Sequence, residues 1–152
     1  MSRRNRLFAA LSLVLIGAPL LAAPADTVRS RIAGLRELGA AFKNANDGLR
    51  GGEPQIIVIQ QSAREIRNAA TAQYQWFPVG TGANPAWKTA AKPEIWTQAA
   101  QFRAAQDNFA RAAEVFQRAA MGGNANAMRT SARALGATCK ACHERFKAQD
   151  KS

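Results

Sequence analysis

Apolar residues recur at spacings of three and four along most of the chain, which is the period of an amphipathic helix. The first such segment covers residues 28–42, and glycines between residues 48 and 52 end it. The second covers residues 56–70 and follows Pro54, a residue suited to a first helical turn. The short run "IIVI" within it also suits a strand, but the longer period favours a helix. The apolar positions are Val28, Ile32, Leu35, Leu38, Phe42, Ile56, Ile59, Ala63, Ile66 and Ala70.

The second half of the chain contains two more helical segments after an irregular stretch. Residues 77–92, "FPVGTGANPAWKTAAK", lose the period and gather turn-forming residues, which is typical of a functional loop. Pro93 opens the third segment, and "GGN" at 122–124 ends it. In this segment phenylalanines recur at intervals of seven, as in a bundle seam, at Phe102, Phe109 and Phe116. The fourth runs from about residue 125 to the tail, and its apolar side contains Met128, Leu135, Cys139, Cys142 and Phe146.

Four amphipathic segments without a convincing strand predict an all-α fold, an antiparallel four-helix bundle over residues 26–152. A chain of 152 residues suits one such domain. The phenylalanine seam is typical of a core, but the residues around it are mostly alanine. Side chains alone would fill such a bundle loosely, which indicates that something else occupies part of the interior.

The first 25 residues differ from the rest. Three arginines precede an apolar stretch from Leu7 to Leu21, and alanines follow at positions 22, 23 and 25. This layout is typical of a cleaved export signal. The alternative is a retained membrane anchor, but Gly17 and Pro19 interrupt the stretch, which is shorter than the roughly 20 residues that a spanning helix needs. We therefore predict a signal peptide over residues 1–25, cut between 22 and 25, and no membrane association after cleavage.

Cleavage changes the charge balance. The whole chain has 21 basic and 10 acidic residues, and three of the basic ones lie in the signal, which leaves 18 against 10, a formal +8. These basic residues are spread over all the helical segments. Such a distribution is typical of a solvated surface that favours acidic partners, and an exported protein seldom meets nucleic acid. We predict no nucleic-acid partner.

The stretch "CKACHERFK", residues 139–147, contains both cysteines and the only histidine. Three kinds of site suit these residue types. A structural zinc site needs four nitrogen or sulfur ligands, and the chain offers three, of which Cys142 and His143 are adjacent. A thioredoxin-like dithiol lies near a βαβ pattern, which this sequence lacks. The third is covalent attachment of a c-type haem, for which C-x-x-C-H is the characteristic motif.

The spacing of these residues suits haem attachment. Cys139 and Cys142, three positions apart on a helix, lie on one side and can each bond a vinyl group of the haem. His143 then offers a ring nitrogen to the iron. The motif occurs together with an export signal and a helical pattern, and no other cysteine or histidine is present. We therefore predict one covalently bound haem c with His143 as an axial ligand of its iron.

On these residues the chain resembles the class II cytochromes c, and most closely the cytochromes c prime. Beside the motif, whose place in the last helix is typical of class II, the resemblance rests on "RIAGLRELGAAF" at 31–42, "FPVGTG" and "KPEIW". It covers nearly the whole chain after the signal. It implies a four-helix bundle with the haem near the C-terminus of the last helix, a periplasmic location, and a homodimer packed through the first two helices.

The resemblance also implies roles for individual residues. For the motif it implies that Cys139 and Cys142 attach the haem and that His143 binds the iron. Arg31 would lie near a haem propionate, where a guanidinium can pair with a carboxylate. Leu35 would cover the distal face of the iron, and Lys147 would flank the proximal histidine, where several members have arginine. The alternative for Arg31 and Lys147 is ordinary surface charge.

Function depends on the sixth coordination position of the iron. An electron carrier usually fills it, commonly with methionine. Met121 and Met128 are poorly placed, Leu35 cannot bind iron, and Lys43 lies more than a turn beyond Leu35. We therefore predict five-coordinate, high-spin haem in an apolar distal pocket. The predicted ligands are nitric oxide and carbon monoxide, as the resemblance also implies, and redox proteins are possible further partners.

Two alternative functions remain. A low-spin class II cytochrome acting as a periplasmic electron carrier would supply a distal methionine from the first helix, which has none here. A peroxidase-like enzyme would need a distal acid–base residue such as histidine, and the only histidine is assigned to the iron. We therefore predict a protein that is not an enzyme.

Overall fold

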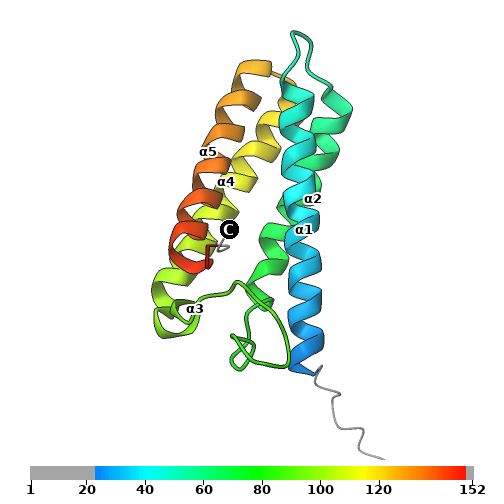
Figure 1. Ribbon diagram of the computed structural model, residues 1–152. Coiled ribbons are helices and arrows are strands. Elements are labelled where there is room, and N and C mark those ends of the chain that lie inside the picture. The colour runs from blue at the N-terminus through cyan, green and yellow to red at the C-terminus, as the bar shows by residue number, and fades with distance from the viewer. Residues whose placement is uncertain (1–22, 150–152) are drawn as a thin grey trace, which may run out of the picture.

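Four long helices form an antiparallel bundle in the computed structural model, which describes residues 23–149 (Figure 1). Residues 1–22 of the predicted signal peptide and residues 150–152 of the predicted domain lie outside the described part. The all-α prediction is confirmed. The helices are α1 (Pro24–Leu49), α2 (Ile56–Ala72), the 3-10 turn η1 (Gln73–Gln75), α3 (Glu94–Thr97), α4 (Ala99–Gly122) and α5 (Ala125–Phe146).

The predicted third helix is broken near its start. We expected one helix from Pro93 onwards, but Gln98 has φ −121° and ψ 47° and separates the short α3 from α4. The indole nitrogen of Trp96 donates to the carbonyl oxygens of Phe77 (3.1 Å) and Pro78 (3.2 Å). These bonds hold α3 against the irregular loop rather than in line with α4, and α4 begins only after the chain has turned.

The junction between α4 and α5 follows the usual rules for helix ends. Gly123 closes α4 in the left-handed conformation with φ 70°, a conformation that glycine adopts without steric cost. Asn124 is the N-cap of α5, and its side-chain oxygen accepts a hydrogen bond of 2.9 Å from the Ala127 amide. The "GGN" stop predicted from the sequence is therefore the turn that reverses the chain before the motif helix.

The buried apolar side chains form two clusters of unequal size. The larger cluster takes residues from all four long helices, among them Leu49, Ile59, Phe116, Met128 and Leu135. The smaller cluster has Ile95, Phe102 and Phe146 at its centre, with Phe77 packed against it, and lies where α3, the loop and the end of α5 meet.

The long helices do not contact one another equally. α1 packs along α2, α2 along α4 and α4 along α5, whereas α1 and α5 contact each other much less. The bundle therefore has one weakly closed side, between α1 and α5, and the motif helix forms part of it.

No helix among residues 23–149 is both long enough and apolar enough to cross a membrane.

Candidate haem-binding site

The last two turns of α5 contain all three motif residues. Cys139 and Cys142 are half-buried, and His143 is exposed. Cys139 packs against the larger apolar cluster, while Cys142 packs against the smaller one. The two thiols therefore lie at the junction of the clusters, on one side of the helix, as their spacing predicted.

Both cysteine thiols are free. Burial raises the pKa of the Cys139 thiol, and burial together with the charge of Cys139 raises the pKa of Cys142. The raised pKa values mean that these thiols are protonated near neutral pH rather than reactive thiolates. This state suits residues that await covalent attachment, and it does not suit a low-pKa redox dithiol.

Two effects lower the pKa of His143 and thereby favour its neutral imidazole form. Desolvation by the surrounding protein lowers its pKa below 6.5, and the charge of Lys147 lowers it further. A neutral imidazole is the form that binds a metal ion. Among residues 23–149 no three His, Cys, Asp or Glu side chains are grouped so that they could hold a metal ion by themselves. The neutral ring therefore suits iron that arrives within a larger prosthetic group.

Counting residues along α1 and α5 from their close approach indicates that Leu35 lies about level with His143. A Cβ atom on Gly136 of α5 would lie 3.1 Å from the Phe42 ring of α1, so the two helices approach closely at this pair. Leu35 lies seven residues before Phe42, and His143 lies seven residues after Gly136. Seven residues make almost two helical turns, so each lies on the same helix face as its reference residue. Because α1 and α5 run in opposite directions (Figure 1), both lie about 10 Å beyond the contact, on facing surfaces.

These facing surfaces are not covered by other side chains. Leu35 is 39% exposed, and His143 and Lys147 are exposed as well. At Gly136 the absence of a side chain lets α1 and α5 approach closely, but this position lies two helical turns from His143. An apolar leucine that faces a histidine across a weakly closed side of the bundle fits a flat, largely apolar group held between the two helices. The residues present therefore fit haem.

Arg31 is the largest fully buried side chain, with 1% exposure. Its guanidinium donates to the Thr81 hydroxyl, the Thr81 carbonyl and the Thr89 hydroxyl, each at 2.9 Å, and to the Trp76 carbonyl at 3.3 Å. Burial lowers the pKa of this guanidinium. All four acceptors are neutral, so a carboxylate such as a haem propionate would supply the missing counter-charge. Arg31 is not the ordinary surface charge that the sequence left as an alternative, and its pairing with a propionate stays a prediction.

Sequence reasoning missed the loop residues that hold Arg31. Thr81 is buried and Thr89 half-buried, in the stretch that lost the helical period. Their hydroxyls come within reach of α1 only because the loop folds back across the end of the bundle, in a position that no periodicity could predict. The one available signal was the length of the loop itself.

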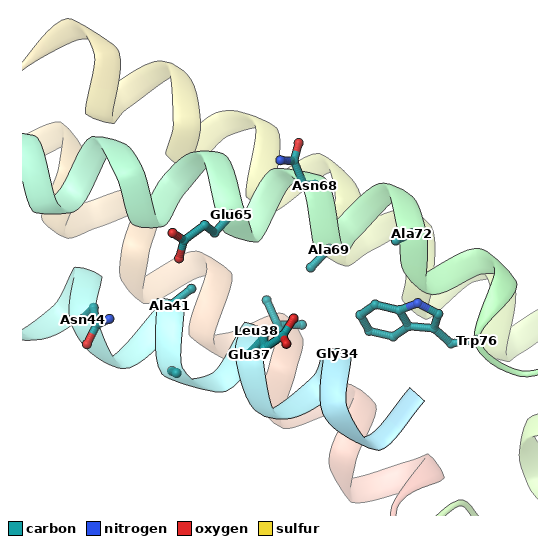
Figure 2. A pocket seen from close by; sticks show the side chains of 11 residues that line it. Gly34, Glu37, Leu38, Ala41, Asn44, Glu65, Asn68, Ala69, Ala72 and Trp76 are labelled. Atoms are coloured by element: carbon teal, nitrogen blue, oxygen red, sulfur yellow. The ribbon is translucent and has the colours of Figure 1, made fainter. Parts of the chain in front are cut away.

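A groove between α1 and α2 lies away from the motif. Its volume is about 570 Å³, and Figure 2 shows Trp76 closing one end. Gly34 lets the indole lie against α1, since a Cβ atom there would meet the Trp76 ring at 2.8 Å. The lining is formed mainly by small and polar residues, namely Gly34, Glu37, Leu38, Ala40, Ala41, Asn44, Glu65, Asn68, Ala69, Ala72 and Trp76. No cysteine or histidine reaches this groove.

Comparison with known proteins places this arrangement in a family. The family model described as Cytochrome C' matches residues 26–147. A cytochrome c' of Pararhodospirillum photometricum is 32% identical over 126 residues, which cover 83% of this chain and 99% of that protein.

Solved structures agree with the sequence match. A cytochrome c' with an unusual ligand-controlled dimer dissociation superimposes with a TM-score of 0.78 and 26% identity, covering 84% of this chain and 98% of the other. The nitric oxide complex of a leucine-to-alanine variant of cytochrome c prime from Alcaligenes xylosoxidans has a TM-score of 0.77 and 25% identity, covering 86% and 99%. The chain therefore belongs to the cytochrome c' family, whose members carry covalently bound haem c, and its two cysteines are present for that attachment.

Proposed function

We propose that this protein is a periplasmic gas-binding cytochrome whose haem iron is five-coordinate and high-spin. Cys139 and Cys142 hold the haem through thioether bonds, and His143 is the single protein ligand of the iron. Nitric oxide and carbon monoxide take the opposite position. The proposal rests on the exposed Leu35, which by residue counting lies about level with His143 on the neighbouring helix, because leucine has no atom that can bind iron.

No other described side chain is well placed to become the sixth ligand. Met128 is fully buried in the larger cluster, and Met121 lies at the end of α4 on the exposed surface. Lys43 is engaged by Asp47, with 2.5 Å between its ammonium nitrogen and the carboxylate. The low-spin electron carrier, the main alternative, needs such a ligand, so the geometry favours the open position.

Ligand choice follows from the apolar character of the Leu35 side. Bound dioxygen and anions gain from a nearby hydrogen-bond donor, whereas nitric oxide and carbon monoxide bind without one. The relative from Alcaligenes xylosoxidans was solved with nitric oxide bound to a variant in which a leucine is replaced. That result on a relative supports a role for leucine in gas binding here.

We further propose a homodimer formed through α1 and α2. Ile57 and Val58 of α2 are 74% and 40% exposed, and the groove of Figure 2 runs between the same two helices. A relative in this family shows ligand-controlled dimer dissociation, which supports association between copies. Light scattering on the Ala40→Arg variant, which places a long cation in the groove, should report a monomer where the unchanged protein is a dimer. An unchanged protein that is already monomeric at micromolar concentration contradicts this part of the proposal.

The optical spectrum of the exported protein, ferric and ferrous, tests the central proposal. A broad high-spin Soret band that sharpens and shifts with nitric oxide or carbon monoxide is the expected result. The Leu35→Ala variant is the matched test of the distal side, and it should bind carbon monoxide faster, by about tenfold, if the removed contacts are worth about 1.4 kcal/mol. Sharp low-spin bands that ignore gas would make electron exchange with periplasmic redox proteins the better assignment.

A further inference from the structure

We propose that three phenylalanines, Phe77, Phe102 and Phe146, form a positioning unit that sets the distance between Leu35 and His143 and thereby the rate of gas binding. We call these residues the aromatic bridge. The proposal rests on the function proposed above, and it adds three residues that are neither haem attachment points nor iron ligands in that proposal, although Cys142 packs against the cluster that contains Phe102 and Phe146.

The aromatic bridge is a continuous chain of ring contacts. The rings of Phe77 and Phe102 meet edge to face, with centroids 5.0 Å apart and planes at 76°. Phe102 meets Phe146 in the same way, at 5.1 Å and 77°. Edge-to-face pairs at these distances are favourable beyond the burial of their area. The loop, α4 and α5 each contribute one ring, so this row of rings crosses the end of the bundle where α4 begins and α5 ends.

The two ends of the aromatic bridge lie one turn from the two residues that matter. The Arg31 guanidinium lies over the Phe77 ring, 4.8 Å from its centroid, and Arg31 is one helical turn before Leu35 on α1. At the other end, Phe146 follows His143 by three residues on α5. A contact path therefore runs from the Leu35 turn to the His143 turn without passing through the space between them.

Hydrogen bonds fix the loop to both helices as well. Arg31 holds the loop through Thr81 and Thr89, as described above. At its other end the loop joins the tail of α5, where the Lys92 amide donates to the Phe146 carbonyl (3.0 Å) and the Ala148 amide to the Ala90 carbonyl (2.8 Å). The loop is thus attached to α1 on one side and to the end of α5 on the other.

Apart from these loop contacts, α1 and α5 contact each other little, so the aromatic bridge adds side-chain packing to the hydrogen-bonded link. Their close approach at Phe42 and Gly136 lies two turns away from Leu35 and His143. Loosening the bridge should let the Leu35 turn of α1 move away from α5. Leu35 then crowds the ligand position less, and a gas molecule reaches the iron faster.

The test compares Phe102→Leu with Phe116→Leu in the haem-loaded protein. Both residues are buried phenylalanines of α4, fourteen positions apart on the same face, but Phe116 belongs to the larger cluster. Two readouts are taken, the carbon monoxide association rate and the hydrogen–deuterium exchange of backbone amides in residues 31–38. Phe102→Leu should raise the association rate about tenfold and speed the exchange of this segment, and Phe116→Leu should change neither by more than about twofold after correction for global stability.

Each outcome decides the matter. Unchanged exchange at residues 31–38 in Phe102→Leu overturns the bridge, whatever the gas kinetics. Equal effects of the two variants also overturn it, because they indicate general loosening of the core. Faster exchange with an unchanged association rate overturns the link to gas binding. If the proposed gas-binding function itself is wrong, the optical spectrum of the unchanged protein shows this independently, as low-spin bands that do not respond to gas. Phe77→Leu repeats the comparison from the loop if Phe102→Leu does not fold.

Discussion

The two ends of the bundle use the same four helices in different ways. Above the contact of Phe42 with Gly136, the larger cluster closes the interior with fully buried side chains such as Phe116 and Met128. We call this the closed half. Below it, in the open half, Leu35 and His143 face each other uncovered, and the smaller cluster lies to one side. The comparison teaches that the tightly packed core and the proposed haem site occupy different levels along the bundle axis.

Removing both thiols should have the largest effect and should be confined to the open half. In the double variant Cys139→Ala, Cys142→Ala we expect complete loss of covalently bound haem, because no other described residue is a cysteine. Haem staining after denaturing electrophoresis measures the loss. His143→Ala is the control, since it removes the proposed iron ligand and leaves both cysteines available for thioether bonds. Covalent haem retained by the double variant would contradict the assignment.

Truncating a core residue of the closed half should cost stability without touching the motif. Phe116 is fully buried in the larger cluster, so Phe116→Ala should lower the free energy of unfolding by about 3–5 kcal/mol. Chemical denaturation measures the change. The neighbouring Val115 is 47% exposed, and Val115→Ala should change the free energy of unfolding by about 0.5 kcal/mol or less. Equal losses for the two variants would contradict the packing described for the closed half.

The boundary between the halves can be moved at Gly136. A Cβ atom at this position lies 3.1 Å from the Phe42 ring, so the larger Gly136→Val side chain should force the helices apart and lower the free energy of unfolding by about 1–3 kcal/mol. In Gly136→Ala the crowding is smaller and the gain in helix propensity, about 1 kcal/mol, offsets it. We therefore expect near-neutral stability for alanine and a clear loss for valine, both from denaturation curves. If the valine variant were as stable as the alanine variant, the close approach of α1 and α5 at Gly136 would be contradicted.

The smallest expected effect is on the pKa of His143 in the haem-free chain. Burial and the charge of Lys147 lower this pKa below 6.5, so the unfolded chain binds more protons than the folded chain in that range. The stability that the neutral ring contributes is therefore present above pH 6.5 and is lost as the pH falls through the lowered value. Lys147→Met should raise the pKa part of the way, because burial, the larger cause, remains.

Nuclear magnetic resonance can follow this titration directly, since the chain has one histidine. Lys140→Met is the matched control, as Lys140 does not contribute to the lowered pKa of His143. A His143 pKa that moves equally in the two variants would contradict the local effect of Lys147.

The helices and the motif could be predicted from sequence because their signals are local. The period of three and four located the four long helices, and "GGN" located the turn before α5. The break at Gln98 could not be predicted in this way, because it results from the bonds between Trp96 and the distant loop. Local patterns record what a segment favours by itself, and this break depends on a partner about twenty residues away.

The candidate site divides along the same line. The spacing of Cys139, Cys142 and His143 shows their common side of the helix directly, whereas the burial of Arg31 depends on the hydroxyls of Thr81 and Thr89, some fifty residues further on. The facing of Leu35 and His143 could be predicted from sequence only in part. It follows by counting seven residues along each helix, but only once the contact between Phe42 and Gly136 is known.

The close approach at Gly136 also has a mechanical consequence. Two rods that tilt about such a point as a pivot separate at their ends in proportion to the lever arm. With a lever arm of about 10 Å, set by a rise of about 1.5 Å per residue, a tilt of about 5° at Gly136 displaces Leu35 from His143 by about 0.9 Å. Under the proposed function, a tilt of this size at Gly136 would change how closely Leu35 approaches a diatomic molecule bound to the iron.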